Sequence, residues 1–173
     1  LLSLGELTVI EHVVSCVQPL VGQIIVVTND PDSVTFLGLA TTPDITPDKG
    51  PLMGLYSGLS ACTTPWGLVV ACDAPFLSGA LLVGLLERRQ DNAMVLPLTE
   101  RGPQPMPGLY PTSIASTIAG LLESGRSAMR DLIAAGPVEL LDIADIKRLD
   151  PEGQSFMDID TPEDLATARI IAE

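Results

Sequence analysis

The sequence predicts a three-layer α/β domain with a mostly parallel sheet, formed by residues 1–173 as a single unit. Short runs of β-branched apolar residues alternate along the chain with segments in which leucine and valine recur at helical spacing. Hydrophobic residues make up 46% of the sequence and aromatic residues only 3%. Aliphatic side chains must therefore fill the core, as they do between the layers of α/β proteins.

The first half of the chain is predicted to contain three helices and three strands. Thr8 is a suitable cap for the first helix, and Pro19 ends it. Pro51 stands in the first turn of the third helix, where proline is favoured. In order, the elements are a helix over 8–18, a strand over 24–29, a short helix over 30–37, a strand over 39–44, a helix over 50–62 and a strand over 66–72, which we expect to be buried on both faces.

The second half continues the alternation. Leu81, Leu82, Leu85 and Leu86 form the core face of its first helix, and the prolines of its second strand predict a place at the edge of the sheet. Thr161 and Pro162 are typical of a helix start. In order, the elements are a helix over 78–89, strands over 93–98 and 105–111, helices over 112–123 and 127–135, strands over 138–143 and 156–160, and a helix that begins at 161.

Composition limits the partners. Nine basic residues against 22 acidic ones give a formal charge of −13, which would repel nucleic acid and an anionic membrane surface. We expect neither as a partner. The three cysteines, Cys16, Cys62 and Cys72, have no Cys-x-x-Cys spacing, so neither a disulfide framework nor a zinc site is indicated. A reducing cytosol is the simplest compartment, and we predict a cytoplasmic protein.

Asp73 is the only charged residue between Lys49 and Glu87. It follows the strand predicted over 66–72, and open α/β sheets bind ligands at the carboxyl ends of their strands. An ionised carboxylate in apolar surroundings requires a metal cation, a positive side chain or a proton nearby. The alternative is that Asp73 caps the turn at Ala74-Pro75. The sequence leaves both open, and the first makes Asp73 the candidate catalytic metal ligand.

Gly50, Gly54 and Gly58 form one stripe of the helix predicted over 50–62. Each glycine inside a helix costs about 1 kcal/mol relative to alanine, so the stripe indicates that something packs closely against it. Packing of the helix on the sheet explains Gly54 and Gly58. A flat base or a phosphate against the N-terminal amides explains Gly50 better, which makes Gly50-Pro51-Leu52 a candidate nucleotide-binding segment.

Asp158 and Asp160 flank Ile159, and at strand spacing their carboxylates point the same way. With Asp73 they predict an oxygen-ligand site for Mg²⁺, which binds one or two carboxylates together with substrate phosphates. Asp160 is the second candidate metal ligand after Asp73. The alternative is that Asp160 and Thr161 only cap the last helix.

Arg126 and Arg130 lie one helical turn apart in a chain that is poor in basic residues. Two guanidinium groups at this spacing suit a phosphate or an acidic substrate. The alternative is a pair of surface arginines that form ion pairs with Glu123 or Asp131.

Together these motifs resemble the molybdenum cofactor guanylyltransferases, a family among the nucleotidyltransferases of nucleotide-sugar type. The resemblance covers the whole chain and implies a Rossmann-like fold of the nucleotide-diphospho-sugar transferase type. It also implies Mg²⁺-dependent transfer of GMP from GTP to molybdopterin, with release of pyrophosphate. The shared segments, in the family's order and spacing, are Gly50-Pro51-Leu52-x-Gly54-Leu55, Cys72-Asp73-x-Pro75-Phe76-Leu77, Gln104-Pro105 to Leu109-Tyr110, Gly125-Arg126-Ser127 and Asp160-Thr161-Pro162-Glu163-Asp164-Leu165.

The resemblance implies that Asp73 binds magnesium and that Asn29 and Asp44 contact the guanine nucleotide. Arg126 and Ser127 would lie toward molybdopterin, and Gln104 of the shared motif is placed with them. GTP and molybdopterin are then the small-molecule partners. Molybdoenzymes and other proteins of the cofactor pathway are candidate protein partners.

The resemblance also implies an upstream glycine-rich signature, Leu-Ala-Gly-Gly-x-Ser-x-Arg-Met-Gly-x-Asp-Lys, that leads into Leu1-Leu2. We therefore expect a domain whose first strand and phosphate-cradling loop lie upstream of residue 1. Family members often carry Asn at the positions of Asp158 and Asp160, and an Asp-Ile-Asp-Thr-Pro pattern is common in the molybdopterin cytidylyltransferases. Cytidylyl transfer is one alternative. The other is a catalytically silent module that binds or delivers molybdopterin.

Overall fold

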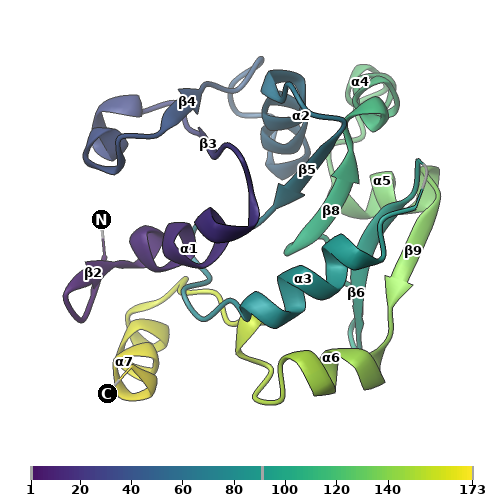
Figure 1. Cartoon of the computed structure of the whole chain (residues 1–173). Helices are drawn as coiled ribbons and strands as arrows, with labels where there is room; N and C mark the ends of the chain where they lie inside the picture. Colours follow the sequence, from purple (N-terminus) through teal and green to yellow (C-terminus); the bar gives the residue numbers. More distant parts are fainter. Residues whose placement is uncertain (1, 91, 173) are drawn as a thin grey trace.

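A mixed five-stranded sheet lies at the centre of the computed structural model, which describes residues 2–90 and 92–172 (Figure 1). Strand β8 lies between β5 and β6, and β6 also pairs with β7 and β9. The strands are β5 (Trp66–Val69), β6 (Met94–Thr99), β7 (Gly102–Pro103), β8 (Gly108–Pro111) and β9 (Val138–Leu141).

The direction of the strands differs from a simple parallel sheet. β8 is antiparallel to both β5 and β6, whereas β9 is parallel to β6. β5, β6 and β9 therefore point one way and β8 the other. The prediction that the segment over 105–111 forms an edge strand is wrong. Only Gly108–Pro111 is a strand, so Pro105 and Pro107 lie outside it and Pro111 is its last residue, which leaves the ladder intact.

Two smaller sheets lie nearer the amino terminus. β3 (Ile25–Val27) and β4 (Ala40–Thr42) pair in parallel, and β1 (Ser3–Leu4) and β2 (Leu7–Thr8) form an antiparallel hairpin. Strand β5 is shorter than predicted, and of its residues only Gly67 is buried. Both faces of β5 are packed as expected, since Leu68 and Val69 lie against different core clusters, but the strand is only partly buried.

The helices occur close to their predicted places. Thr8 caps α1 through a capping box with Glu11, and Ser78 caps α3. The α-helices are α1 (Val9–Val17), α2 (Pro51–Ala61), α3 (Gly79–Glu87), α4 (Ala115–Glu123), α5 (Met129–Ala135), α6 (Ile143–Leu149) and α7 (Pro162–Ile171). Short 3-10 helices occupy Gln18–Leu20, Pro31–Leu37, Thr112–Ile114 and Gln154–Phe156.

Two differences from the sequence prediction stand out. Helix α6 occupies a segment for which no helix was expected. The strand predicted over 156–160 is also wrong, because Phe156 ends a 3-10 helix and residues 157–160 are irregular. The alternation of apolar and acidic residues there arises because Ile159 turns into a small buried cluster with Leu4, Val9 and Ala168.

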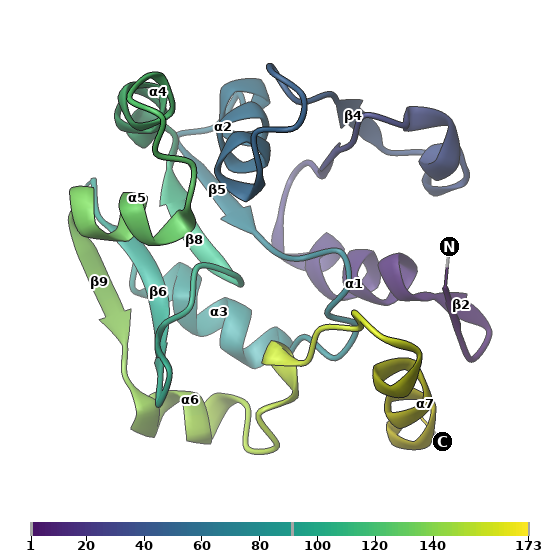
Figure 2. The same cartoon turned by 180° about the vertical axis from the view of Figure 1, so that it is seen from behind.

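The helices cover both faces of the sheet, as Figure 2 shows from behind. Alternate side chains of one strand serve the two layers. Val95 of β6 belongs to the core cluster of α1, α3 and α6, whereas Met94 and Leu96 belong to that of α2, α4 and α5. On β8, Leu109 and Tyr110 divide in the same way. The predicted three-layer α/β arrangement is therefore present.

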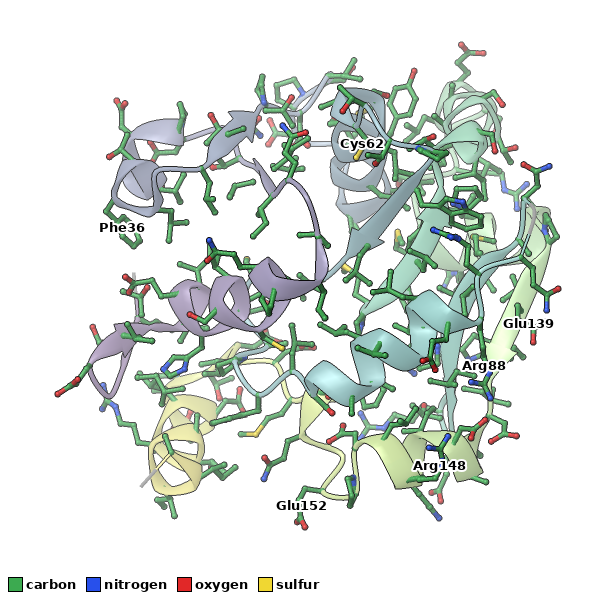
Figure 3. All side chains as sticks on the ribbon, viewed as in Figure 1. Phe36, Cys62, Arg88, Glu139, Arg148 and Glu152 are labelled. Carbon is green, nitrogen blue, oxygen red and sulfur yellow. The ribbon has the colours of Figure 1, made fainter. Side chains whose placement is uncertain are left out.

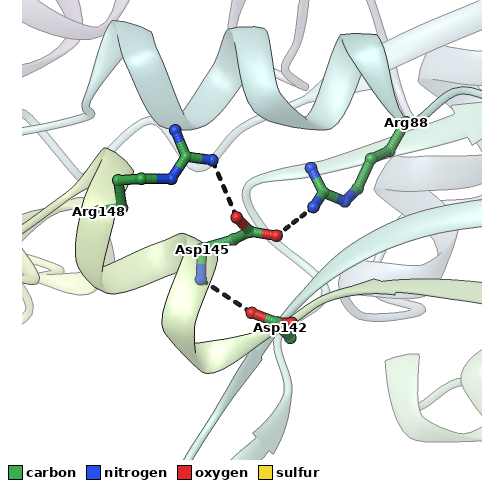
Figure 4. A network of polar contacts seen from close by, with 4 residues as sticks. All are labelled: Arg88, Asp142, Asp145 and Arg148. Atoms are coloured by element: carbon green, nitrogen blue, oxygen red, sulfur yellow. Dashed lines mark hydrogen bonds and ion pairs between the residues drawn. The ribbon is translucent and has the colours of Figure 1, made fainter.

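Polar contacts join α3 to α6 at the surface of the layer formed by α1, α3 and α6 (Figure 4). Arg88, at the end of α3, and Arg148 both bind the carboxylate of Asp145, with 2.9 Å between Arg148 Nη2 and Asp145 Oδ1. Asp142 Oδ1 caps α6 by accepting from the Asp145 amide at 2.8 Å. These side chains lie far from Phe36, which projects into solvent at the other side of the molecule (Figure 3).

Candidate functional site

Asn29 and Asp44 hold the ends of β3 and β4 together. Asn29 Nδ2 donates to Asp44 Oδ2 at 3.0 Å, and the Asp44 amide donates to Asn29 Oδ1 at 2.9 Å. The sequence separates the two residues by a 3-10 helix and a strand, and parallel pairing brings them side by side. The two residues that the resemblance assigned to the nucleotide are thus in direct contact.

Asp44 has one oxygen to spare. Within residues 2–90 and 92–172, Asp44 Oδ1 is the one buried side-chain polar atom without a hydrogen-bond partner. It faces Gly54 of α2, where an added Cβ would lie 3.8 Å away. Buried acceptors are nearly always paired, so this oxygen points to a donor that the protein itself does not provide.

The loop after Asp44 is held against the start of α2. The Ile45 amide donates to Ser57 Oγ at 2.9 Å, and Ser57 Oγ donates to the Met53 carbonyl at 2.8 Å. Gly50 is the N-cap of α2 with φ of 78°, and it offers no side chain to the first-turn amides. Pro51 has no N–H and the Met53 amide donates to the Gly50 carbonyl at 3.0 Å, so the first turn presents no set of free amides to an acceptor from outside.

The three glycines of α2 have different surroundings. An added Cβ at Gly58 would lie 3.1 Å from Val27 Cγ2, so close packing explains that glycine. At Gly50 nothing lies within 4 Å of such an atom, and the positive φ explains the glycine instead. Leu52 is fully buried in the core, so it presents no surface to a ligand.

A cavity of about 530 Å³ opens beside the start of α2. Its wall includes Gly50 and Ser127, two residues that the sequence placed at different parts of the site. Tyr56, Met53 and Lys49, which sequence reasoning did not select, also line it. Tyr56 and Met53 occupy helical positions that are typical of core residues, so no signal in the sequence identified them as cavity-lining residues.

Arg126 and Gln104 are engaged with neighbouring residues. Arg126 Nη2 lies 3.2 Å from Asp131 Oδ1, which is the ion pair that the sequence offered as the alternative. Its side chain is 49% exposed, so this pair is weak. Gln104 Nε2 donates to Thr99 Oγ1 at 3.0 Å and to the Gly102 carbonyl at 3.2 Å, within the turn between β6 and β7.

Asp73 and the segment 158–160 approach each other from opposite halves of the chain. The Ile159 amide donates to the Asp73 carbonyl at 2.9 Å. Ser155 fixes the approach, because its Oγ accepts from the Ser78 amide at 2.8 Å next to the start of α3. The segment 158–160 thus passes next to Asp73, and the charges of Asp73 and Asp160 are near enough to the Asp158 carboxyl to affect its pKa, although the predicted strand is absent.

The pKa of the Asp158 carboxyl reflects its partial burial and the nearby carboxylates of Asp73 and Asp160. Partial burial raises the pKa of Asp158 above its usual value, and the negative charges of Asp73 and Asp160 raise it further. The residue as a whole is exposed, so the shift describes the surroundings of its carboxyl group and not a buried side chain. Like charges that raise a pKa in this way are relieved by a cation.

The cap of α7 leaves the Asp160 carboxylate free of that role. Thr161 Oγ1 accepts from the Asp164 amide at 3.1 Å, and Asp164 Oδ2 accepts from the Thr161 amide at 2.8 Å. Asp160 contributes only its own amide, which donates to Asp164 Oδ2 at 3.2 Å. Thr161 Oγ1 also donates to Asp164 Oδ2 at 2.7 Å, and this bond, followed by those from the Thr161 and Asp160 amides, lowers the pKa of Asp164.

Within the part of the chain that the structure describes, no three His, Cys, Asp or Glu side chains form a group that could hold a metal ion. The carboxylates of Asp73, Asp158 and Asp160 therefore suit a hard cation such as Mg²⁺ only if one or two of them bind it and substrate phosphates supply further ligands, as the sequence predicted. None of the helices in the same ranges is both long and apolar enough to cross a bilayer.

Comparison with known proteins gives a consistent result. Residues 1–140 match the family model of the MobA-like NTP transferase domain. A Flavobacterium johnsoniae protein named "Probable molybdenum cofactor guanylyltransferase" is 32% identical over 135 residues, which are 78% of this chain and 70% of that protein. A Natronomonas pharaonis protein of the same name is 37% identical over 131 residues, covering 73% of this chain but only 62% of its own length.

The fold is also found among solved structures. The molybdopterin-guanine dinucleotide biosynthesis protein A of Archaeoglobus fulgidus superposes with a TM-score of 0.82 at 22% identity, over 98% of this chain and 88% of that one. At this identity the likeness establishes the fold alone.

Proposed function

The chain belongs to the family of MobA-like NTP transferase domains, and we propose that it transfers GMP from GTP to molybdopterin and releases pyrophosphate. The observation that carries this proposal is the family match, together with relatives named molybdenum cofactor guanylyltransferase. In this reaction the terminal phosphate of molybdopterin attacks the α-phosphorus of GTP. The protein contributes positioning and charge neutralisation, and it needs no nucleophile of its own.

In this proposal the Asn29 group, which comprises Asn29, Asp44 and Gly50-Pro51-Leu52, binds the guanine nucleotide. The unpaired Asp44 Oδ1 accepts a hydrogen bond from the nucleotide, and Asn29 keeps the carboxylate in place through its two hydrogen bonds. Gly50 lines the cavity beside α2 and has no side chain to occupy the space that the nucleotide would take. Pro51 and Leu52 act through the backbone they fix.

The Asp73 group, which comprises Asp73, Asp158 and Asp160, would hold magnesium, with Asp73 as the catalytic ligand and Asp160 as the second. When bound, Mg²⁺ supplies positive charge for the α-phosphate and for the leaving pyrophosphate. The raised pKa of Asp158 supports a cation site here, because a cation would lower it. Asp158 then faces the substrate next to that site.

Molybdopterin is assigned to Gln104, Arg126 and Ser127. Ser127 shares a cavity with Gly50, which suits an acceptor that must approach the nucleotide. Arg126 would exchange its exposed ion pair with Asp131 for the phosphate of molybdopterin, at little cost because such pairs are weak.

The complete domain in this proposal has a mostly parallel sheet of the nucleotide-diphospho-sugar transferase type. Its first strand and glycine-rich phosphate loop precede residue 1. The protein acts in the cytoplasm and passes its product to a molybdoenzyme or another protein of the cofactor pathway.

Cytidylyl transfer is the competing function, favoured by the Asp158-Ile159-Asp160-Thr161-Pro162 segment. Binding of the two nucleotides to the full-length protein separates the two functions. With equal magnesium, we expect GTP to raise the melting temperature by several degrees, as a ligand at about a hundred times its Kd would, and CTP far less. A product assay with molybdopterin should then yield the guanine dinucleotide. A larger shift and a faster reaction with CTP would reassign the protein to cytidylyl transfer.

A further inference from the structure

One acidic side chain in the interior has no part in the site described above. Among residues 2–90 and 92–172, Asp150 is the one charged residue that is buried, with 6% of its surface exposed. None of the ion pairs in the same ranges involves it. A carboxylate is costly to bury without a positive partner, so its place in the interior requires a structural or functional reason.

Asp150 is the C-cap of α6 and holds the chain that follows the helix. Its amide donates to the Ile146 carbonyl at 2.7 Å, and its own carbonyl accepts from the Gly153 amide at 3.0 Å. Its side chain reaches further along the chain, where Oδ2 accepts from the Ser155 amide at 3.0 Å. The carboxylate therefore fixes Ser155 through a hydrogen bond that its negative charge strengthens.

Ser155, which is 1% exposed, connects this contact to α3. Its Oγ accepts from the Ser78 amide at 2.8 Å. Ser78 Oγ in turn donates to the Leu149 carbonyl at 2.7 Å, next to Asp150. Hydrogen bonds and the chain thus form a closed ring, which we call the Asp150 ring: Asp150, Ser155, Ser78 and Leu149. Buried polar groups that are paired in this way specify one arrangement of the segments they join.

Packing keeps the Asp150 ring in place. An added Cβ at Gly84 of α3 would lie 2.6 Å from Leu149 Cδ1, so the end of α6 is pressed against α3. Both views of the ribbon show these two helices side by side (Figures 1 and 2). Phe156, the residue after Ser155, packs against the core cluster that contains α3 side chains. The ring is therefore anchored on packed helices.

The Asp150 ring joins the two segments that supply the Asp73 group. Ser78 follows Asp73 by five residues, and Ser155 precedes Asp158 by three. The same segments meet again where the Ile159 amide donates to the Asp73 carbonyl at 2.9 Å. Two successive hydrogen bonds thus hold the segments together, and Asp150 orients the acceptor of the first.

From these observations we propose that Asp150 is a positioning residue for the Asp73 group. By holding Ser155 against Ser78, it keeps the segment 158–160 beside Asp73, so that carboxylates from both segments can bind one cation. Asp150 acts through Ser155 and not by contact with the cation. The inference rests on the proposed function, because it takes the Asp73 group to hold magnesium.

The test uses variants of the full-length protein. Asp150→Ala removes the acceptor of the Ser155 amide, whereas Asp150→Asn retains an oxygen that can accept from it. Ser155→Ala breaks the next link and leaves Asp150 in place, so the test does not depend on one variant alone. Asp142→Ala is the matched control, because it removes the N-cap of the same helix, whose Oδ1 accepts from the Asp145 amide at 2.8 Å, without touching the ring.

Hydrogen exchange of the backbone amides, followed by NMR without any ligand, measures how firmly the segment is held. We expect the Ile159 amide to exchange at least about tenfold faster in Asp150→Ala and Ser155→Ala, relative to the amides of β6, which report global unfolding. In Asp150→Asn and Asp142→Ala the exchange should stay within about threefold of the wild type.

Titration of GTP with and without magnesium connects the ring to the metal. We expect magnesium to tighten GTP binding by at least about tenfold in the wild type and Asp142→Ala, but by less than about threefold in Asp150→Ala and Ser155→Ala. Asp150→Asn should restore the effect of magnesium. Metal-free GTP affinity should be equal in all of them, because other residues form the Asn29 group. A purely structural role would lower the midpoint of thermal unfolding and leave the effect of magnesium unchanged.

Two results would overturn the inference. One is exchange of the Ile159 amide in Asp150→Ala that is no faster than in Asp142→Ala. The other is a wild-type effect of magnesium in both Asp150→Ala and Ser155→Ala. Loss of any magnesium effect in the wild type would instead contradict the proposed function. The exchange measurement involves no nucleotide, so it would still decide whether Asp150 holds the segment.

Discussion

The two groups of the proposed site are built in opposite ways. In the Asn29 group, reciprocal hydrogen bonds between a carboxamide and a carboxylate fix the ends of two paired strands, and one acceptor is left over. In the Asp73 group, one backbone hydrogen bond brings the segment 158–160 next to Asp73, and partial burial together with the charges of Asp73 and Asp160 raises the pKa of Asp158. The first group is held by its own hydrogen bonds, whereas in the proposed function the second is completed by a cation.

This difference assigns the two groups different tasks. A fixed arrangement of hydrogen-bonding groups selects a ligand by shape and hydrogen bonding. A cluster of like charges at the end of an apolar segment instead binds a metal and, through it, phosphates. Substitutions that affect nucleotide binding and the transfer reaction to different degrees therefore test this difference between the two groups.

The largest effect is expected from Asp73→Asn in the full-length protein. The substitution keeps the size of the side chain but removes the charge that would hold magnesium, so the transfer rate should fall by at least about a hundredfold. Thermal unfolding should stay close to that of the wild type. Cys72→Ala, one residue away, is the matched control and should retain activity; a fully active Asp73→Asn variant would remove magnesium from this group.

A smaller effect is expected from Asn29→Ala. The loss of both hydrogen bonds to Asp44 should weaken GTP binding by about tenfold and lower stability by about 1 kcal/mol. Calorimetric titration and urea unfolding measure the two effects. Thr41→Ala on the exposed side of β4 serves as the control, and unchanged GTP affinity in Asn29→Ala would separate this residue from the nucleotide.

The smallest effect concerns Asp158 and pH. A carboxyl whose pKa is raised on folding holds its proton more tightly in the folded chain. The stability it contributes is therefore present below the unfolded pKa of about 4 and is lost as pH rises through the raised value. Without metal, Asp158→Asn should raise the melting temperature at pH 7 by about 1–2 °C and change little near pH 3. An equal shift at both pH values would contradict the proposed cause.

Local signals in the sequence predicted many of the elements well. Thr8 and Thr161 carry cap chemistry that depends on neighbours a turn away, and the helices begin where these residues indicate. The apolar face of α3 was likewise readable, because Leu81, Leu82 and Leu85 are buried. Such features require no knowledge of distant parts of the chain.

Features that depend on pairing between distant segments were predicted less well. The central place of β8 follows from its partners and not from its own prolines. The segment 156–160 alternates like a strand but is held by Ile159 in a buried cluster and by Ser155 next to α3. The family resemblance placed Asn29 and Asp44 at the nucleotide but did not predict their contact with each other, since nothing in either local segment indicates it.

The central claim is that a nucleotide bound at the Asn29 group shares a magnesium ion with Asp73. The most direct test is titration of GTP into the full-length wild type and the Asp73→Asn variant, each with and without magnesium. We expect magnesium to tighten GTP binding by at least about tenfold in the wild type and to have no such effect in Asp73→Asn, with equal metal-free affinities. Equal enhancement by magnesium in both proteins would contradict the claim.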